Sequence, residues 1–287
     1  MGAPYDLVIL DFDGTFTDAE AEAGPFFTAY RERAASMLAE HGLRDFDGAW
    51  DAALAQVEAE PGAHGWSWDG RVVAPGDADP YLRATVVMNV LFDARGLYAD
   101  GEARKGVLQV LYETSYPKSA TVFRPDARAV AEALLSSGMH VAVVTNSATD
   151  AVNAKLDALA PRGRERLRVH GNAEKYVVVE PSPADATFAA VPEAARAPGL
   201  ARPIFLRRGR YYEVLRRLWD ELGTTAERTF VAGDIYELDL ALPAALGASV
   251  QLVGKERTPA FERAAVADLP RGRVDDRLGA LLERVGL

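Results

Sequence analysis

An apolar run near the start of the chain ends abruptly in two carboxylates and a glycine turn. Residues 7–10 are Leu, Val, Ile and Leu, and Asp11, Asp13, Gly14 and Thr15 follow within five positions. Four consecutive apolar residues predict a strand that is buried on both faces, as in a parallel sheet. The glycine supplies a sharp turn, so both acids lie at the carboxyl end of that strand. Ligands of open parallel sheets bind at this end, which makes it the first candidate site.

Two other interpretations are open for this stretch taken alone. Asp and Gly are common turn formers, so the sequence could be a simple turn. It could also begin a calcium-binding loop, which needs a further acid or amide two residues on and a glutamate at its twelfth position. Thr15, which is neither an acid nor an amide, and Glu22 stand in the matching region. The fit to a calcium loop is therefore partial, and the helix that should precede such a loop is missing.

A second acidic strand end lies far downstream. The apolar run 229–233 leads directly into Asp234, and Asp239 follows five residues later. Carboxylates from two strand ends of one sheet would crowd together, which raises their pKa values and opposes folding unless a cation lies among them. Oxygen-rich clusters suit a hard divalent cation, and Mg²⁺ is the usual one when a phosphate is also bound. The sequence therefore predicts a magnesium site.

A third strand end carries neutral polar groups. The apolar run 140–144 is followed by Thr145, Asn146 and Ser147. Hydroxyl and amide groups, together with backbone N–H groups, can hold phosphate oxygens. The alternative is that these residues only cap a helix that begins near Ala148, which is a common use of Ser, Thr and Asn.

Together, the three stretches resemble the motifs of the haloacid dehalogenase superfamily of phosphatases and phosphotransferases. Its first motif is an apolar strand followed by Asp-x-Asp-Gly-Thr. Its second is a strand that ends in Thr or Ser, and its fourth is Gly-Asp followed by a second Asp. Their order and spacing agree with this chain from Asp6 to about Gly254. The resemblance implies an α/β fold with a doubly wound, mostly parallel Rossmann-like sheet and a smaller α-helical cap domain.

The resemblance also implies a role for each motif residue. Asp11 would be the nucleophile that takes the phosphoryl group as an aspartyl phosphate, and Asp13 would be the general acid and base. Relatives that cleave carbon–halogen bonds lack an acid at the position of Asp13, so its presence favours phosphate chemistry. The implied magnesium ligands are Asp11, Asp13 through its backbone carbonyl, Asp234 and Asp239. The groups implied to contact the phosphoryl group are Gly14, Thr145 and Asn146.

The third motif of this superfamily, a lysine that neutralises the phosphoryl charge, has two candidates here. Its usual place, just before the helix expected near Tyr211, carries Arg208 among other arginines. Lys175 follows an earlier strand closely, and an insertion would account for its long distance from Asp234. Lysine offers a compact point charge and arginine a planar fork, so the two are not equivalent. We prefer Lys175, with Arg208 as the second candidate or as an added phosphate ligand.

The sheet does not need the long segment between the first two motifs. Residues 20–118 contain apolar side chains at helical spacing and predict a helical cap domain, which leaves 1–19 and 119–287 as the α/β core. In the superfamily such an insertion closes over the active site and selects the substrate. The crossover 176–206 predicts either a small strand-bearing lobe or a long loop. The remaining core is expected to contain a strand at 249–253 and helices at 211–222 and 277–285.

Composition narrows the classes of partner. The formal net charge of −10 leaves no basic surface for a nucleic-acid backbone, and the absence of cysteine excludes disulfides and thiolate metal sites. There is no apolar stretch of about 18 residues and no secretory segment at the start. We expect a cytoplasmic monomer or homodimer that binds a small phosphorylated substrate, no nucleic acid and no membrane.

The leading hypothesis is a magnesium-dependent phosphatase that hydrolyses a small phosphorylated metabolite through an aspartyl phosphate. A phosphomutase of the same superfamily, which returns the phosphoryl group to the substrate, is the first alternative, and the core motifs do not separate the two. A non-catalytic binding or regulatory relative is the second. Four crowded carboxylates argue against that second alternative, because a site without turnover has no physical reason to keep them.

Overall fold

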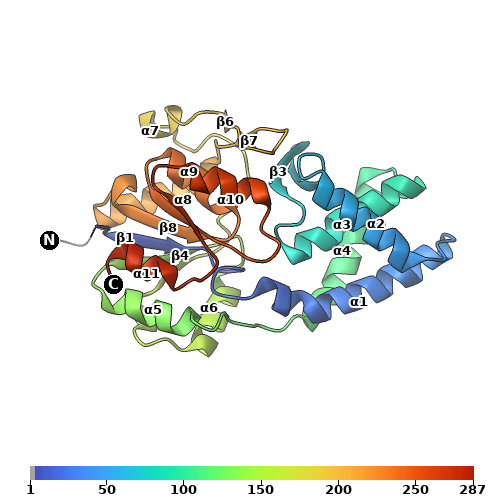
Figure 1. Ribbon diagram of the computed structural model, residues 1–287, viewed down its shortest axis with the longest axis horizontal. Coiled ribbons are helices and arrows are strands. Elements are labelled where there is room, and N and C mark those ends of the chain that lie inside the picture. The colour runs from blue at the N-terminus through green and yellow to red at the C-terminus, as the bar shows by residue number, and fades with distance from the viewer. Residues whose placement is uncertain (1–3) are drawn as a thin grey trace. The chain divides into compact units, whose positions relative to one another are not determined.

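The computed structural model describes residues 4–287, and the chain divides into two compact units (Figure 1). The first unit comprises Met1–Asp18 and Phe123–Leu287, and the second comprises Ala19–Val122. The large parallel sheet lies in the first unit, and the second is inserted in the sequence between its first two strands.

Six parallel strands form the sheet of the first unit, in the order β10-β9-β8-β1-β4-β5. Their bounds are β1 (Leu7–Leu10), β4 (His140–Val144), β5 (Arg168–His170), β8 (Thr229–Gly233), β9 (Ser249–Val253) and β10 (Gly272–Asp275). The chain leaves β1 towards β4 and β5 and later returns on its other side to β8, β9 and β10. The carboxyl end of β1 is therefore the topological switch point, where open α/β sheets bind ligands. The predicted doubly wound parallel sheet is confirmed.

Helices cover both faces of this sheet (Figure 1). One face packs against α8 (Gly209–Leu222), α9 (Ala241–Ala245) and α10 (Ala260–Ala267), and the other against α5 (Ala127–Ser136), α6 (Thr149–Leu159) and α11 (Ala280–Val285). Leu7 and Ile9 of β1 belong to the first hydrophobic core, and Val8 and Leu10 to the second. Burial on both faces explains why this strand is apolar at every position.

The crossover between β5 and α8 contains a small antiparallel pair. Its elements are α7 (Ala186–Ala189), β6 (Ala194–Ala195) and β7 (Ile204–Phe205). Of the two predictions for this segment, the strand-bearing lobe is correct. The apolar stretch 177–179 forms no strand, and Val179 makes a single bridge to Arg208. The short helical turns of the chain are η1 (Tyr116–Lys118), η2 (Arg164–Arg166), η3 (Ala226–Arg228) and the π-helical η4 (Tyr236–Leu240).

The second unit is helical, as predicted, but also contains a hairpin. Its helices are α1 (Ala19–Glu40), α2 (Phe46–Ala59), α3 (Pro80–Arg95) and α4 (Gly101–Ser115). The last three each follow an aspartate whose carboxylate accepts an N–H from the first turn. The hairpin joins β2 (Gly65–Trp68) to β3 (Arg71–Pro75) through Asp69 and Gly70, whose φ angles are 47° and 71°. Asp-Gly is a strong signal for such a turn.

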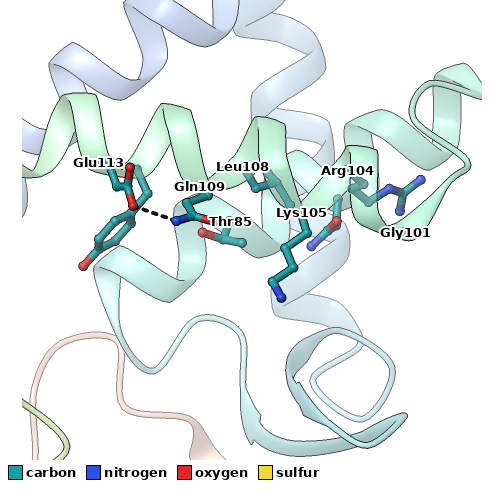
Figure 2. A pocket seen from close by; sticks show the side chains of 9 residues that line it. Thr85, Gly101, Arg104, Lys105, Leu108, Gln109 and Glu113 are labelled. Carbon is teal, nitrogen blue, oxygen red and sulfur yellow. Dashed lines mark hydrogen bonds between the residues drawn. The ribbon is translucent and has the colours of Figure 1, made fainter.

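An open pocket of about 530 Å³ borders α3 and α4 of this unit (Figure 2). Gln109 donates a hydrogen bond to Glu113 at 2.7 Å along its rim. None of the motif residues singled out in the sequence lines it. Within residues 4–287, no helix combines the length and the apolar character that crossing a membrane requires.

Candidate active site

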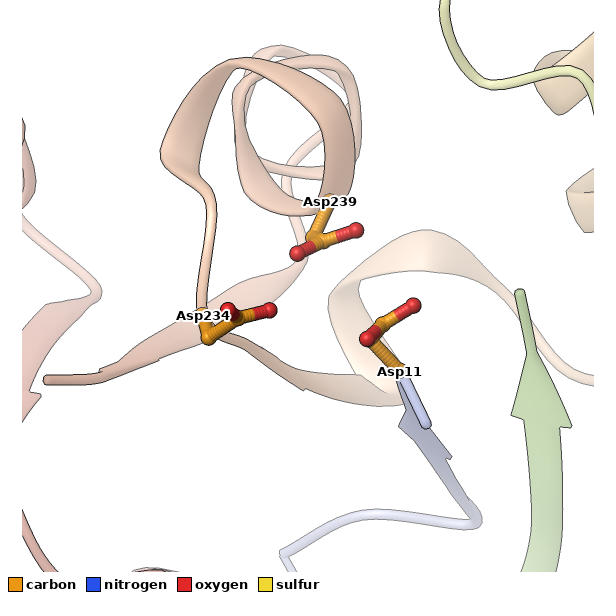
Figure 3. Close-up of side chains that lie close together, drawn as sticks. All are labelled: Asp11, Asp234 and Asp239. Carbon is orange, nitrogen blue, oxygen red and sulfur yellow. The ribbon is translucent and has the colours of Figure 1, made fainter. Parts of the chain in front are cut away.

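Three buried carboxylates meet at the carboxyl edge of the sheet (Figure 3). Asp11 directly follows β1, Asp234 directly follows β8, and Asp239 lies on η4. One oxygen from each carboxylate can be chosen so that all three atoms lie within 4.8 Å of one another. The structure thus brings together three of the acids that the sequence predicts as magnesium ligands.

Two glycines allow this close approach. Gly14 has a φ of +82°, and a Cβ atom built there would lie 2.1 Å from Oδ2 of Asp234. At Gly233 a Cβ atom would lie 2.4 Å from the Cβ of Asp239. Both contacts are far shorter than van der Waals distance, so any larger residue at either position would push the acids apart.

The π-helical turn η4 fixes the third acid. The backbone N–H of Ile235 donates to Oδ2 of Asp239 at 3.0 Å, and the N–H of Asp239 donates to the Ile235 carbonyl at 2.9 Å. The hydroxyl of Tyr211, on α8, donates to the backbone carbonyl of Asp239 at 2.9 Å. Single π-helical turns are frequent at functional sites. Here the turn folds the Asp239 carboxylate back towards the end of β8.

Lys175 supplies a cation to this cluster. Its Nζ donates to Oδ1 of Asp11 at 2.7 Å and to Oδ1 of Asp239 at 2.8 Å, and the residue is 1% exposed. The side-chain carbonyl of Asn146 accepts the backbone N–H of Lys175 at 2.8 Å. Of the two predicted cations, the structure places Lys175 against the acids.

Arg208 lies behind Lys175. Its Nη1 donates to the backbone carbonyl of Lys175 at 2.8 Å, and its Nε donates to the carbonyl of Phe205 at 2.9 Å. Complete burial lowers the pKa of Arg208 to about 10, despite the opposing effect of Glu237. The arginine therefore braces the loop that carries Lys175.

The charges of the cluster explain what it can bind. Burial raises the pKa of Asp11 well above its usual range, and Asp239 and Asp234 raise it further, against the effect of Lys175. Burial alone would lower the pKa of Lys175, but Asp11 and Asp239 outweigh it and raise that pKa, so the ammonium stays charged. Three buried carboxylates this close together offer the oxygen ligands that suit a divalent cation. The donor set therefore fits Mg²⁺.

Asp13 faces different partners from Asp11. Its Oδ2 accepts the Ser147 hydroxyl at 2.5 Å, and its Oδ1 accepts Nζ of Lys155, on α6, at 3.2 Å. Its side chain is 30% exposed, whereas that of Asp11 is 10% exposed. Both carboxylate oxygens of Asp13 are thus held by side chains outside the three-carboxylate cluster. These side chains, Ser147 and Lys155, come from the segment that follows β4.

The predicted phosphate-binding groups lie at the ends of β1 and β4. The hydroxyl oxygen of Thr145 accepts the backbone N–H of Ser147 at 3.1 Å. The N–H of Gly14 donates to the Thr17 hydroxyl at 3.2 Å. Arg124 holds the carbonyl of Gly14 with two hydrogen bonds, at 2.8 and 3.1 Å. The loop after β1 is therefore fixed from both sides.

Several residues at this edge were not found from the sequence. Arg124, Lys155 and Lys255 contact the first or fourth motif, and Lys255 donates to Oδ2 of Asp234 at 2.5 Å. Lys255 had a usable signal, because it comes just after the predicted strand 249–253 and a glycine, as the acids of the first and fourth motifs come after their strands. Arg124 and Lys155 had no such sequence signal, since neither of them follows the end of a predicted strand.

A second buried charged group supports η4 from outside. Arg202 forms two hydrogen bonds to Glu237, at 2.6 and 2.8 Å, and Glu237 is fully buried. Glu262, on α10, is also fully buried. Burial and the nearby Glu237 raise the pKa of Glu262 well above its usual range. Glu262 is therefore a buried carboxyl group that resists ionisation.

Replacement of Glu262 by glutamine should stabilise the protein increasingly as the pH rises. The folded-state pKa of Glu262 is raised by burial, so above the unfolded pKa folding must take up a proton. That penalty grows by at most about 1.4 kcal/mol per pH unit and stops growing at the folded pKa. Glutamine keeps the size without this penalty. Calorimetry should show a melting temperature several degrees above wild type at pH 8 and a smaller difference at pH 5.

Glu283→Gln is the matched control, because Glu283 is exposed on α11. It should leave the melting temperature close to that of wild type at both pH values. If the melting temperature of Glu262→Gln differed from that of wild type by the same amount at pH 5 and at pH 8, the assignment of a raised pKa to Glu262 would be contradicted.

Comparisons with known proteins identify the fold. No family model matches the sequence, and no curated protein matches it. Among solved structures, a predicted phosphoglycolate phosphatase from Haemophilus somnus 129PT aligns over 99% of each chain, with a TM-score of 0.55 and 13% identity. A haloacid dehalogenase-like family hydrolase from Xanthomonas campestris aligns over 99% of this chain and 97% of its own, with a TM-score of 0.54 and 14% identity. The predicted haloacid dehalogenase-like fold is confirmed.

Proposed function

We propose that this chain, which has the haloacid dehalogenase-like fold, is a magnesium-dependent phosphatase acting on a small phosphorylated metabolite. The observation that carries the proposal is the contact between Asp11 and the buried ammonium of Lys175, at the switch point of the sheet. A carboxylate held in this way can attack phosphorus, and the ammonium can neutralise the incoming phosphoryl oxygens. The solved phosphatase and hydrolase structures support the proposal through their shared fold alone.

The residues divide the reaction between them. Asp11 attacks the phosphorus atom in line and forms an aspartyl phosphate, while Asp13 donates a proton to the leaving oxygen. Thr145 donates its hydroxyl proton to a phosphoryl oxygen, and Lys175 balances the charge that develops there. Water then attacks the aspartyl phosphate, with Asp13 accepting its proton, and inorganic phosphate leaves.

The acid cluster would hold the metal. Asp11, Asp234 and Asp239 offer the side-chain oxygens, and the backbone carbonyl of Asp13 is a further ligand implied by the resemblance. A bound Mg²⁺ supplies positive charge that orients the phosphoryl group and lowers the repulsion between it and Asp11. Without such charge, a dianionic substrate would approach three carboxylates.

Release of inorganic phosphate tests the proposal. The panel contains para-nitrophenyl phosphate and sugar, nucleotide and carboxylic acid phosphates, each assayed with Mg²⁺ and with chelator. We expect turnover that depends on Mg²⁺ and that ranks the substrates by size and charge. Absence of release from every substrate would favour a non-catalytic relative. Isomerisation of a sugar phosphate without net release would favour the phosphomutase.

Asp13→Asn should separate the two chemical steps. Without a group that can give and take a proton, the protein should still transfer a phosphoryl group to Asp11 slowly but should release it about 10²- to 10⁴-fold more slowly than wild type. Mass spectrometry of the intact protein after rapid acid quenching would detect the trapped adduct of one phosphoryl group. Ser147→Ala, which removes one hydrogen bond to Asp13, is expected to have a smaller effect. Wild-type turnover in Asp13→Asn would remove the acid–base role.

A further inference from the structure

A fourth strand end brings a second lysine to the acid cluster. Lys255 follows β9, which is the neighbour of β8 in the sheet. Its backbone N–H donates to the Thr258 hydroxyl at 2.8 Å, and its carbonyl accepts the N–H of Thr258 at 3.0 Å and Nη2 of Arg263 at 3.1 Å. The N–H of Gly254 donates to the carbonyl of Asp275 at 2.9 Å. The turn that carries Lys255 is thus fixed on both sides of this residue.

The side chain of Lys255 is buried against a predicted metal ligand. Its Nζ lies 2.5 Å from Oδ2 of Asp234, and the two side chains are 9% and 3% exposed. The same Oδ2 atom lies against Gly14, where a Cβ atom would approach to 2.1 Å. The ammonium therefore binds a carboxylate that is itself packed in place.

The two buried lysines divide the three carboxylates between them. Lys175 binds Asp11 and Asp239, and Lys255 binds Asp234. The acids would repel one another in a dry site, so these ammonium groups stabilise the cluster before any metal enters. A divalent cation that uses the same carboxylates must then compete with ammonium groups, since like charges at close range oppose its binding.

We propose that Lys255 is a built-in competitor for the divalent cation: its ammonium holds Asp234 in the metal-free protein, and the entering cation must displace it. The inference rests on the metal site of the proposed function. Lys175 also binds two of the metal ligands, Asp11 and Asp239, but it is assigned to the phosphoryl charge as well, so its replacement would affect both metal binding and turnover. Lys255 binds Asp234 and has no second assignment in the proposed reaction, so its replacement tests metal affinity.

Binding of Mn²⁺ to the full-length protein tests the inference without any assay of turnover. Isothermal titration calorimetry on chelator-treated protein gives the dissociation constant for Mn²⁺ alone. Lys255→Met removes the charge and should tighten Mn²⁺ binding by about tenfold or more. Lys255→Gln can still donate a hydrogen bond to Asp234 but carries no charge, so it should also tighten binding. Lys255→Arg keeps the charge and should bind Mn²⁺ as weakly as wild type.

Lys155→Met is the matched control. It removes the same unit charge from the same edge of the sheet, but Lys155 contacts Asp13, outside the three-carboxylate cluster. Its effect on the Mn²⁺ dissociation constant should be about threefold or less. The rise in melting temperature on adding Mn²⁺, which grows with affinity, should rank the variants in the same order.

Two results would overturn the inference in different ways. Unchanged or weaker Mn²⁺ binding in both Lys255→Met and Lys255→Gln would remove the competitor role and leave the phosphatase proposal standing. Failure of wild type and all variants to bind Mn²⁺ would remove the metal site itself, and with it the metal dependence of the proposed function.

Discussion

Asp11→Asn is expected to reduce magnesium-dependent phosphate release by about 10⁴-fold or more, to the background of the assay. Asparagine keeps the shape of the side chain and can still accept the hydrogen bond from Lys175, which lies 2.7 Å from Oδ1 in the native site. Its amide cannot form the acyl phosphate that the proposed reaction requires. Phosphate release measured under single-turnover conditions, together with the absence of phosphorylated protein, checks both parts of the expectation.

The same variant should not be lost to unfolding. Burial and two neighbouring carboxylates raise the pKa of Asp11, so removal of its charge relieves repulsion within the cluster. We therefore expect the melting temperature of Asp11→Asn to equal or exceed that of wild type. Asp18→Asn, an exposed acid just before α1, is the control and should retain activity. Residual turnover of a tenth or more in Asp11→Asn would exclude Asp11 as nucleophile.

Lys175→Met is expected to affect both stability and turnover. Methionine fits the space but leaves Asp11 and Asp239 buried without their shared ammonium, and breaking a buried pair in this way costs about 3–5 kcal/mol. Loss of the charge opposite the phosphoryl group should lower turnover by about 10²- to 10³-fold or more. Urea denaturation and phosphate release at saturating Mg²⁺ measure the two effects separately.

Lys105→Met is the control for this variant, because Lys105 is exposed on α4. The same substitution there should change neither the stability to urea nor the rate of phosphate release greatly. Lys175→Arg tests geometry, since a planar guanidinium is larger than the ammonium that bridges the two acids, and it should restore little activity. Full activity in Lys175→Met would transfer the role of the third-motif cation to another residue.

The sequence predicted the fold because the strands nearest the site carry strong signals. β1, β4 and β8 are largely apolar, almost fully buried runs that end at motif residues, and β9 is a buried strand that also contains Ser249 and Gln251. β10 was missed, since its four residues are half-buried and include Arg273 and Asp275. The hairpin of the second unit was missed too, although Asp69 and Gly70 form a recognisable turn between its strands. The apolar side chains at helical spacing elsewhere in residues 20–118 led to the prediction of a wholly helical segment.

The site was predictable in part. Strand order alone implies that Asp11 and Asp234 meet, because β1 and β8 are neighbours and both acids follow the strand directly. Spacing could not decide between Lys175 and Arg208 as the third-motif cation. A lobe is inserted between them, so Arg208 has the usual distance from Asp234 while Lys175 is the one that follows the preceding strand closely. Lys255 escaped notice because a lone lysine after a strand is usually a solvated charge. The roles assigned to these side chains stay predictions until the variants are measured.

The two backbone contacts of Lys175 have a consequence for evolution. Asn146 holds its N–H from the end of β4, and Arg208 holds its carbonyl from the start of α8. The segment between Lys175 and Arg208 can therefore gain or lose residues while the ammonium stays in place, as long as both hydrogen bonds remain. In other sequences of this fold, the matching lysine should be sought by counting forward from the strand that follows β4. Counting backward from the Gly-Asp motif will fail wherever this lobe has grown.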